Sequence, residues 1–169
     1  MTDRAREADL RLLVLLRTRL RRPRAERALA AYSSLGEYGR VWIGAALAGA
    51  LVDRRRRGPW LRAAAGVPLT LGMNFGVKLA VGRERPVLED IVVTGPVPTS
   101  LSFPSAHAAT SFAGATLIGA LAPSLRSGLY VAAGVMAFSR PYLGVHYPSD
   151  VLAGAAVGTA IGRVLARVR

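Results

Sequence analysis

Two histidines, one lysine and one aspartate are the residues of this apolar chain best suited to chemistry. His107 and His146 are the only histidines, and Lys78 is the only lysine among 23 basic residues. A histidine can attack phosphorus directly or protonate a leaving oxygen, and two histidines can divide those roles. An aspartate close to one of them, as Asp150 is to His146 in sequence, can fix the tautomer of the ring and raise its basicity. Fixed cations around helix N-termini would bind the phosphate dianion that such histidines attack.

Five apolar stretches are the elements that must position these residues. They cover residues 38–52, 60–81, 104–122, 125–138 and 148–166. A spanning helix needs about 20 apolar residues, so the two shortest stretches indicate tilt, local thinning or helices that cross only part of the bilayer. We predict an all-α integral membrane bundle of about five spanning helices in residues 35–169. An N-terminal arm, residues 1–34, would precede it and contain an amphipathic interfacial helix.

The candidate residues occur at the ends of these stretches. Successive spans alternate in direction, so the end of the second, the start of the third, the end of the fourth and the start of the fifth share one membrane face. Lys78 and Arg85 are seven residues apart, which predicts a shared helical face before Pro86 ends the helix. Each residue alone can be an interfacial anchor, but together they favour a phosphate site. The residues at that face are Lys78, Arg85, Ser105, His107, Ser139, Arg140, His146 and Asp150.

Composition excludes several classes of protein and of metal site. Cysteine is absent, which rules out disulfides and thiolate metal sites, and two histidines are too few for a multi-histidine cage. Glu89 and Asp90 form a lone acidic pair in the loop predicted over residues 87–101, which is weak support for magnesium. We therefore expect phosphoryl transfer without a metal or other cofactor.

Charge is concentrated in the N-terminal arm. The net charge is +13, and residues 1–40 contain ten arginines. Residues 8–20 place leucine and valine at helical spacing beside Arg11, Arg17 and Arg19, which predicts a helix lying at the membrane interface and attracted to anionic lipids. Binding to nucleic acid is the alternative for such a helix, and the apolar remainder of the chain argues against it.

Two further properties stay open at this point. The run of arginines at residues 54–57 favours that face as cytoplasmic and the candidate site as external, although both faces carry many arginines. Gly154, Gly158 and Gly162 form a small-residue stripe on the last span, which can serve as a packing seam inside the bundle or in a homodimer.

Three ordered motifs resemble those of the type 2 phosphatidic acid phosphatase superfamily. They are Lys78 followed by Arg85-Pro86, then Pro104-Ser105-Ala106-His107, then Ser139-Arg140 followed by His146 and Asp150. The resemblance covers about residues 35–166 and implies that His146 is a nucleophile that forms a phosphohistidine. It implies that Asp150 orients His146, and that His107 protonates the leaving group and then activates water. Phosphate binding would fall to Lys78, Arg85, Ser105, Ala106, Ser139 and Arg140. Ala106 departs from the usual glycine and adds a methyl group near the phosphate.

The segments 101–108 and 143–154 resemble one subgroup, the actinobacterial phosphatases of decaprenylphosphoryl-5-phosphoribose. The resemblance implies a multi-pass enzyme of the plasma membrane that removes a phosphate from a polyprenyl-linked ribose during cell-wall arabinan synthesis. Undecaprenyl pyrophosphate, phosphatidic acid and phosphatidylglycerophosphate are alternative substrates, because the motif residues contact little besides phosphate. A non-catalytic scaffold that binds anionic lipids is the alternative from another class.

Overall fold

Helices make up nearly all of the computed structural model, which describes residues 3–87 and 99–167. Within these ranges the only strand pairing is an isolated antiparallel bridge between Glu84 and Leu101. The all-α prediction is therefore confirmed. In chain order the helices are α1 (Asp3–Arg19), α2 (Pro23–Leu35), α3 (Arg40–Val52), α4 (Arg57–Val81), α5 (Ala106–Leu121), α6 (Arg126–Tyr142) and α7 (Pro148–Arg167). Short 3-10 turns, Glu37–Gly39, Arg54–Arg56 and Pro123–Leu125, precede α3, α4 and α6.

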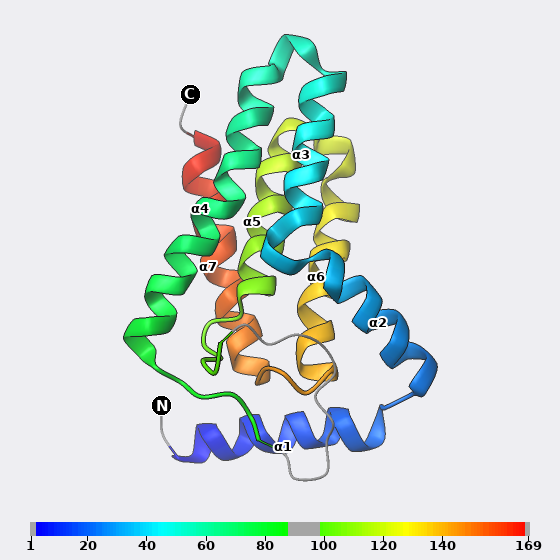
Figure 1. Cartoon of the computed structure of the whole chain (residues 1–169), viewed down its shortest axis with the longest axis vertical. Coiled ribbons are helices and arrows are strands. Elements are labelled where there is room, and N and C mark those ends of the chain that lie inside the picture. The colour runs from blue at the N-terminus through cyan, green and yellow to red at the C-terminus, as the bar shows by residue number, and fades with distance from the viewer. Residues whose placement is uncertain (1–2, 88–98, 168–169) are drawn as a thin grey trace.

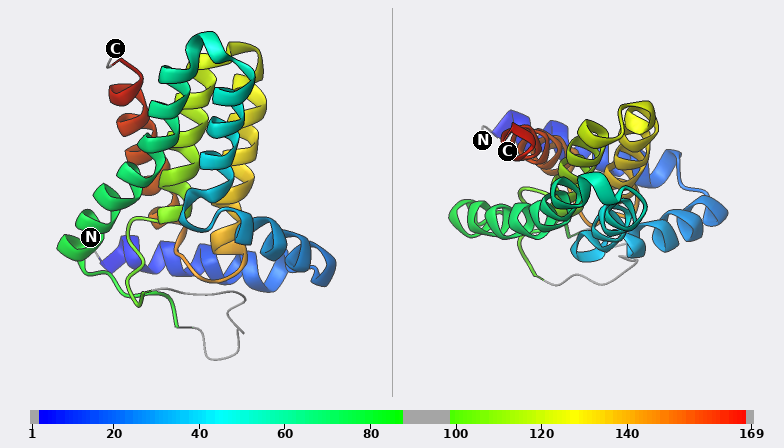
Figure 2. Two further views of the ribbon diagram at one scale, coloured as in Figure 1. Left: turned by 45° about the horizontal axis from the view of Figure 1, so that its top comes forward. Right: turned by 90° about the horizontal axis from the view of Figure 1, so that it is seen from above.

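The five helices α3 to α7 run side by side along the long axis of the molecule (Figure 1). Helix α1 lies across the lower end of this bundle, and α2 slopes from α1 up to α3, as Figure 2 also shows. Most of the loop predicted over residues 87–101 lies outside the described residues. The turns that carry the candidate site residues are at the end of the bundle that α1 crosses.

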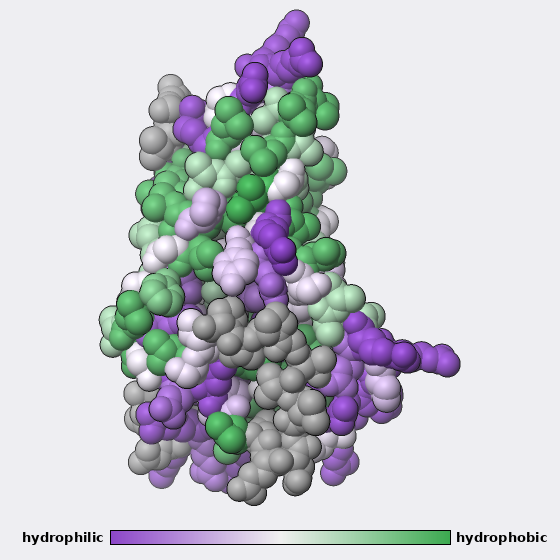
Figure 3. All heavy atoms as spheres, viewed as in Figure 1, coloured by the Kyte–Doolittle hydropathy of each residue, from purple (hydrophilic) through white to green (hydrophobic). Residues whose placement is uncertain are grey.

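The bounds of α3 to α7 agree with the five predicted apolar stretches to within a few residues. Side chains along the bundle form an apolar band, with hydrophilic residues toward its two ends (Figure 3). Two of the described segments, Arg54–Val81 and Pro148–Arg167, are long and apolar enough to cross a membrane, and Ala106–Leu121 is a shorter apolar helix. The number of five spans therefore stays a prediction, whereas the membrane-type helical bundle matches the expectation.

Helix α5 is the central helix and packs against α3, α4, α6 and α7. Its residues Leu117 and Ile118 join Trp42 of α3 and Trp60 and Val67 of α4 in the main buried cluster. The indole Nε1 of Trp42 donates a hydrogen bond of 2.9 Å to the Ser111 hydroxyl of α5, so the buried ring has its polar atom satisfied. This rigid core holds the N-terminus of α5 in place at the site end of the bundle.

The glycine stripe of α7 is the seam along which α7 packs against α5. A Cβ atom on Gly154 would lie 2.5 Å from the Ser105 carbonyl oxygen, and one on Gly158 would overlap the Ala109 carbonyl oxygen. Gly162 faces the side chain of Thr116 in the same way. The three glycines therefore serve the interior of the bundle, which is one of the two roles expected from the sequence.

Substituting Gly158→Ala is expected to destabilise the bundle, because the new methyl group would meet the backbone of α5 rather than a side chain that can move. Overpacking of this kind costs about 1–3 kcal/mol. A lowered melting temperature in detergent would show it. Gly134→Ala in α6 is the matched control, since a Cβ atom there meets nothing within 4 Å, and equal melting of the two variants would contradict the packing argument.

Helix α1 buries a polar face against the bundle. Asp9, Leu13 and Arg17 follow one another at intervals of four residues, so they share the buried face, whereas most of the leucine and valine side chains of α1 are exposed. Arg17 is 3% exposed, and its guanidinium donates to the Tyr142 carbonyl oxygen at 2.6 Å and pairs with Glu26 at 3.2 Å. Arg17 therefore does not belong to the lipid-facing basic surface predicted for this helix, because its charge is used to dock α1 on α6.

Candidate active site

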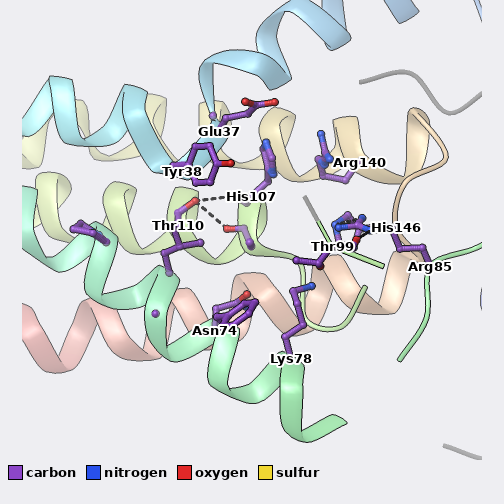
Figure 4. Close-up of a pocket in the computed structure, with 16 residues that line it drawn as sticks. Glu37, Tyr38, Asn74, Lys78, Arg85, Thr99, His107, Thr110, Arg140 and His146 are labelled. Atoms are coloured by element: carbon purple, nitrogen blue, oxygen red, sulfur yellow. Dashed lines mark hydrogen bonds between the residues drawn. The ribbon is translucent and has the colours of Figure 1, made fainter. Parts of the chain in front are cut away.

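A cavity of about 450 Å³ opens between α4, α5 and α6 at the end of the bundle near α1 (Figure 4). Its polar end brings together six of the residues predicted from the motifs. Its apolar part is formed largely by the middle of α4. The lining residues are Gly36, Glu37, Tyr38, Pro68, Leu71, Gly72, Asn74, Phe75, Lys78, Arg85, Thr99, Ala106, His107, Thr110, Arg140 and His146.

Lys78 and Arg85 both line the cavity, but they do not share a helical face. Helix α4 ends at Val81, because Gly82 takes a left-handed backbone conformation (φ 64°) and its N–H donates to the Lys78 carbonyl oxygen at 3.0 Å. Arg85 follows in an extended segment whose N–H donates to the Ser100 carbonyl oxygen. The prediction of a continuous helix to Pro86 is therefore wrong, and the turn at Gly82 brings Arg85 into the cavity instead.

Backbone carbonyl groups, rather than carboxylates, hold Lys78 and Arg85. The Lys78 Nζ atom donates to the Leu101 carbonyl oxygen at 3.0 Å. Arg85 donates from Nε to the Thr99 carbonyl oxygen at 2.8 Å and from Nη1 to the Val145 carbonyl oxygen at 2.7 Å. Among the described residues no carboxylate forms a salt bridge with Lys78, Arg85 or Arg140. Three positive charges therefore remain available to an anionic ligand.

His146 lies in the turn between α6 and α7 and is 2% exposed. Its Nε2 atom is 3.0 Å from Arg85 Nη1, and its Nδ1 atom is 3.4 Å from Asp150 Oδ2. Because a guanidinium group only donates, Nε2 accepts this bond, and the ring proton is on Nδ1 facing the carboxylate. Burial and the surrounding cations, Arg85 first among them, hold the pKa of His146 well below its ordinary value of 6.5. At neutral pH the ring is therefore uncharged, with a lone pair on Nε2 among the cations of the cavity.

Asp150 lies behind His146 in the first turn of α7 and is fully buried. Its Oδ2 atom also accepts from the Tyr147 N–H at 2.9 Å, which satisfies a backbone donor at the start of α7. Its Oδ1 atom pairs with Arg83 Nη1 at 2.8 Å, and Arg83 Nη2 pairs with Asp9 of α1 at 2.7 Å. Sequence reasoning missed the contributions of Arg83 and Asp9, because only the fold brings the N-terminal helix to the first turn of α7.

His107 lines the opposite part of the cavity's polar end from the first turn of α5. Its Nε2 atom donates to the Ser33 carbonyl oxygen at 3.3 Å, and the Ser33 hydroxyl also accepts a short hydrogen bond from Arg140 Nη1. The end of α2 therefore orients one histidine and one cation of the site. No sequence motif marks Ser33, so its part in the site was not predicted.

Two predicted phosphate ligands do not line the cavity. Ser105 is fully buried and caps the N-terminus of α5, where its hydroxyl accepts from the Ala108 N–H at 3.5 Å. Ser139 is fully buried within α6 and donates to the Met136 carbonyl oxygen at 2.6 Å. Ala106, in contrast, lines the cavity as the first residue of α5.

Comparison with known proteins shows the family to which the chain belongs. Residues 59–169 match the PAP2 superfamily. The chain belongs to the PAP2 superfamily. It is 37% identical over 169 residues to the decaprenylphosphoryl-5-phosphoribose phosphatase of Mycobacterium tuberculosis, an alignment that covers 98% of this chain and 93% of the relative. It is 38% identical over 154 residues to the protein of the same name from Mycolicibacterium smegmatis, an alignment that covers 91% of this chain and 84% of that relative.

The fold of this PAP2 protein is similar to that of a solved membrane relative. The transmembrane PAP2 type phosphatidylglycerolphosphate phosphatase from Bacillus subtilis superposes with a TM-score of 0.80 at 22% identity, over 99% of this chain and 90% of that one. The expected family is therefore confirmed, and the protein is a PAP2 lipid phosphatase, a phosphoric monoester hydrolase.

The residues of this phosphatase fit anion binding better than metal binding. In the part of the chain that the structure describes, no group of three or more histidine, cysteine, aspartate or glutamate side chains could hold a metal ion. Glu89 and Asp90 lie outside the described residues. The cavity instead combines three cations with an uncharged histidine, which is the donor set of a phosphate site.

Proposed function

We propose that this PAP2 phosphatase hydrolyses a phosphate monoester of a polyprenyl-linked phosphoribose, the decaprenylphosphoryl-5-phosphoribose of its relatives, through a phosphohistidine intermediate. The position of the His146 lone pair carries the mechanism: Nε2 bears no proton and lies among Lys78, Arg85 and Arg140. The names of relatives that align with nearly the whole chain support the substrate.

The first step transfers the phosphoryl group to His146. The Nε2 lone pair gives up its hydrogen bond from Arg85 Nη1 and attacks phosphorus. The bond from phosphorus to the ester oxygen breaks, and protonated His107 gives a proton to the departing alkoxide. The cations hold the equatorial oxygens as charge develops on them, and the N–H groups at the start of α5, next to Ala106, add their dipoles. Asp150 stabilises the proton on Nδ1 of His146 while the ring becomes positively charged.

The second step releases phosphate. His107, now uncharged, accepts a proton from water, the water oxygen attacks phosphorus, and the bond to Nε2 breaks, which restores the free histidine. Ser105 and Ser139 support this site from behind in our proposal, through the cap of α5 and the last turns of α6. In this proposal, side chains and backbone N–H groups of the chain itself supply the nucleophile, the acid and base, and the phosphate contacts, without a metal or other cofactor.

The apolar part of the same cavity supports a position of the protein within the membrane. Pro68, Leu71 and Phe75 extend the cavity along α4, and Phe75 is 45% exposed on the apolar band, so a lipid tail can enter from the side. We propose a multi-pass protein of the plasma membrane in which the exposed arginines of residues 1–34 contact anionic lipids. From the sequence we also propose that the active site faces the outside of the cell and that the protein can form a homodimer.

Phosphate release by the detergent-purified enzyme in EDTA tests this function. Polyprenyl-phosphoryl-5-phosphoribose and undecaprenyl pyrophosphate are offered in parallel, with His146→Ala as the blank. We expect kcat/KM to favour the phosphoribosyl lipid by roughly tenfold or more, and EDTA to leave the rate unchanged. Preference for the pyrophosphate would move the enzyme to lipid-carrier recycling, whereas loss of activity in EDTA would contradict the cofactor-free mechanism. Membrane insertion without turnover on any lipid phosphate would instead indicate a scaffold.

A further inference from the structure

Asn74 is the one residue of the cavity wall whose buried polar atoms all lack a hydrogen-bond partner among the described residues. The side chain is fully buried in α4, and neither its Oδ1 atom nor its Nδ2 atom is paired. It nevertheless lines the cavity, beside Thr110 and Lys78 in Figure 4. A buried amide without partners costs free energy that a fold avoids unless another molecule supplies them, so Asn74 has the properties of a ligand-binding group.

The position of Asn74 along α4 indicates which part of a substrate it meets. Lys78 is one helical turn later on the same face, and the apolar wall of Pro68 and Leu71 is one to two turns earlier. A lipid phosphate lying along α4, with its phosphate at Lys78 and its apolar part at Leu71, places the group between them at Asn74. In a polyprenyl-phosphoryl-5-phosphoribose, the sugar ring with its hydroxyls follows the scissile phosphate directly, and a phosphodiester then joins the ring to the apolar tail.

Two other polar side chains of the cavity wall already have partners within the fold. The Thr110 hydroxyl donates to the Ala106 carbonyl oxygen at 2.9 Å, and Glu37 pairs with Arg40 at 3.5 Å. A carboxamide offers two donors and one acceptor, which matches a pair of adjacent hydroxyl groups that each donate and accept.

We infer that Asn74 is a specificity-determining residue that hydrogen-bonds the hydroxyl groups of the sugar or polyol carrying the scissile phosphate. This inference rests on the proposed function and adds a recognition element to it. The cations and histidines bind any phosphate monoester, whereas Asn74 distinguishes a hydroxylated carrier from an apolar one. A site with a buried amide rejects a substrate without hydroxyls, because the amide would stay unpaired in the complex.

Kinetics with matched substrates test the inference. The wild type and Asn74→Leu are compared on polyprenyl-phosphoryl-5-phosphoribose and on its 2,3-dideoxy analogue, which keeps the phosphate and the tail. We expect the wild type to lose about 100-fold in kcat/KM when the hydroxyls are removed, and Asn74→Leu to lose little. Thr70→Val is the matched control one turn earlier on the same buried face, since the Thr70 hydroxyl is satisfied by the Gly66 carbonyl oxygen. It should discriminate between the two substrates as the wild type does.

The outcomes separate the inference from the proposed function. Equal losses for wild type and Asn74→Leu on removal of the hydroxyls would overturn the inference and leave the phosphatase assignment intact. If Asn74→Leu lowers kcat/KM equally for both substrates, Asn74 contacts the phosphate or stabilises the packing of α4. That result would overturn the inference as well. A wild type that cleaves neither ribosyl lipid but cleaves undecaprenyl pyrophosphate would contradict the proposed substrate, and the inference with it.

Discussion

Replacing His146 with alanine is expected to abolish phosphate release, with a fall in kcat of at least about 10⁴-fold. The reason is geometric as well as chemical. The Nε2 atom carries the only lone pair of the ring, it lies 3.0 Å from Arg85 Nη1, and Asp150 holds the ring proton on the other nitrogen. His107 is the only other imidazole that lines this cavity, and its Nε2 atom carries a proton that it donates to the Ser33 carbonyl oxygen.

Two variants distinguish the nucleophile from the acid. With an aryl phosphate, whose leaving group needs no proton, His107→Ala should still form a phosphoenzyme and then accumulate it, because the activation of water is lost. His146→Ala should form none. Mass spectrometry of the acid-labile adduct after rapid mixing reports both results. A phosphoenzyme that persists in His146→Ala would refute the assignment, and unchanged melting temperatures would show that both variants are folded.

Much of this site could be predicted from the sequence because its chemistry depends on rare residue types at helix ends. The only two histidines, the only lysine, Arg85 and Arg140 all line one cavity, as their positions at the span ends predicted. The order of the helices follows from apolar stretches and proline positions, which are local properties of the chain.

What the sequence could not supply depends on contacts between distant residues. The spacing of Lys78 and Arg85 suits a helix, but Gly82 ends α4 between them, and a pairing with residues 100–102 decides where Arg85 lies. Ser33 and Asn74 carry no motif, and their importance appears only when the cavity and its unpaired atoms are known. Arg17 resembles the other arginines of its helix in sequence, although burial gives it a different role.

The same kind of contact links the N-terminal helix to the candidate active site. Asp9, 5% exposed at its side chain, pairs with Arg83 and accepts from the Ser149 N–H at 3.0 Å, so it fixes both Arg83 and the first turn of α7. Arg83 in turn pairs with the fully buried Asp150 and packs its guanidinium on the Tyr147 ring at 3.9 Å. Arg83 thus lies between the carboxylates of Asp9 and Asp150, and Asp150 connects this charge network to His146.

Substituting Arg83→Met is therefore expected to leave Asp9 and Asp150 buried without their shared cation. Removing one partner of a buried ion pair costs about 3–5 kcal/mol, and we expect the melting temperature to fall accordingly. We also expect kcat to fall by about 100-fold at unchanged KM, because Asp150 would no longer be held against Nδ1 of His146 while the phosphate cations stay in place. Steady-state kinetics and thermal melting in the same detergent measure both effects.

Asp9→Asn tests the contribution of α1, because Asp9 pairs with Nη2 of Arg83, whereas Asp150 pairs with Nη1. We expect a smaller fall in kcat, about tenfold, that is only partly additive with the loss in Arg83→Met, since Asp9 acts both through the Arg83 guanidinium and through the Ser149 N–H. Glu7→Gln is the matched control on α1. Glu7 is exposed, its one ion pair among the described residues is with Arg11, and its substitution should leave kcat unchanged. If Asp9→Asn lowers the melting temperature but keeps the wild-type kcat, α1 stabilises the bundle without positioning Asp150. A loss of kcat at wild-type stability would instead show that the N-terminal helix holds the carboxylate that orients the nucleophile.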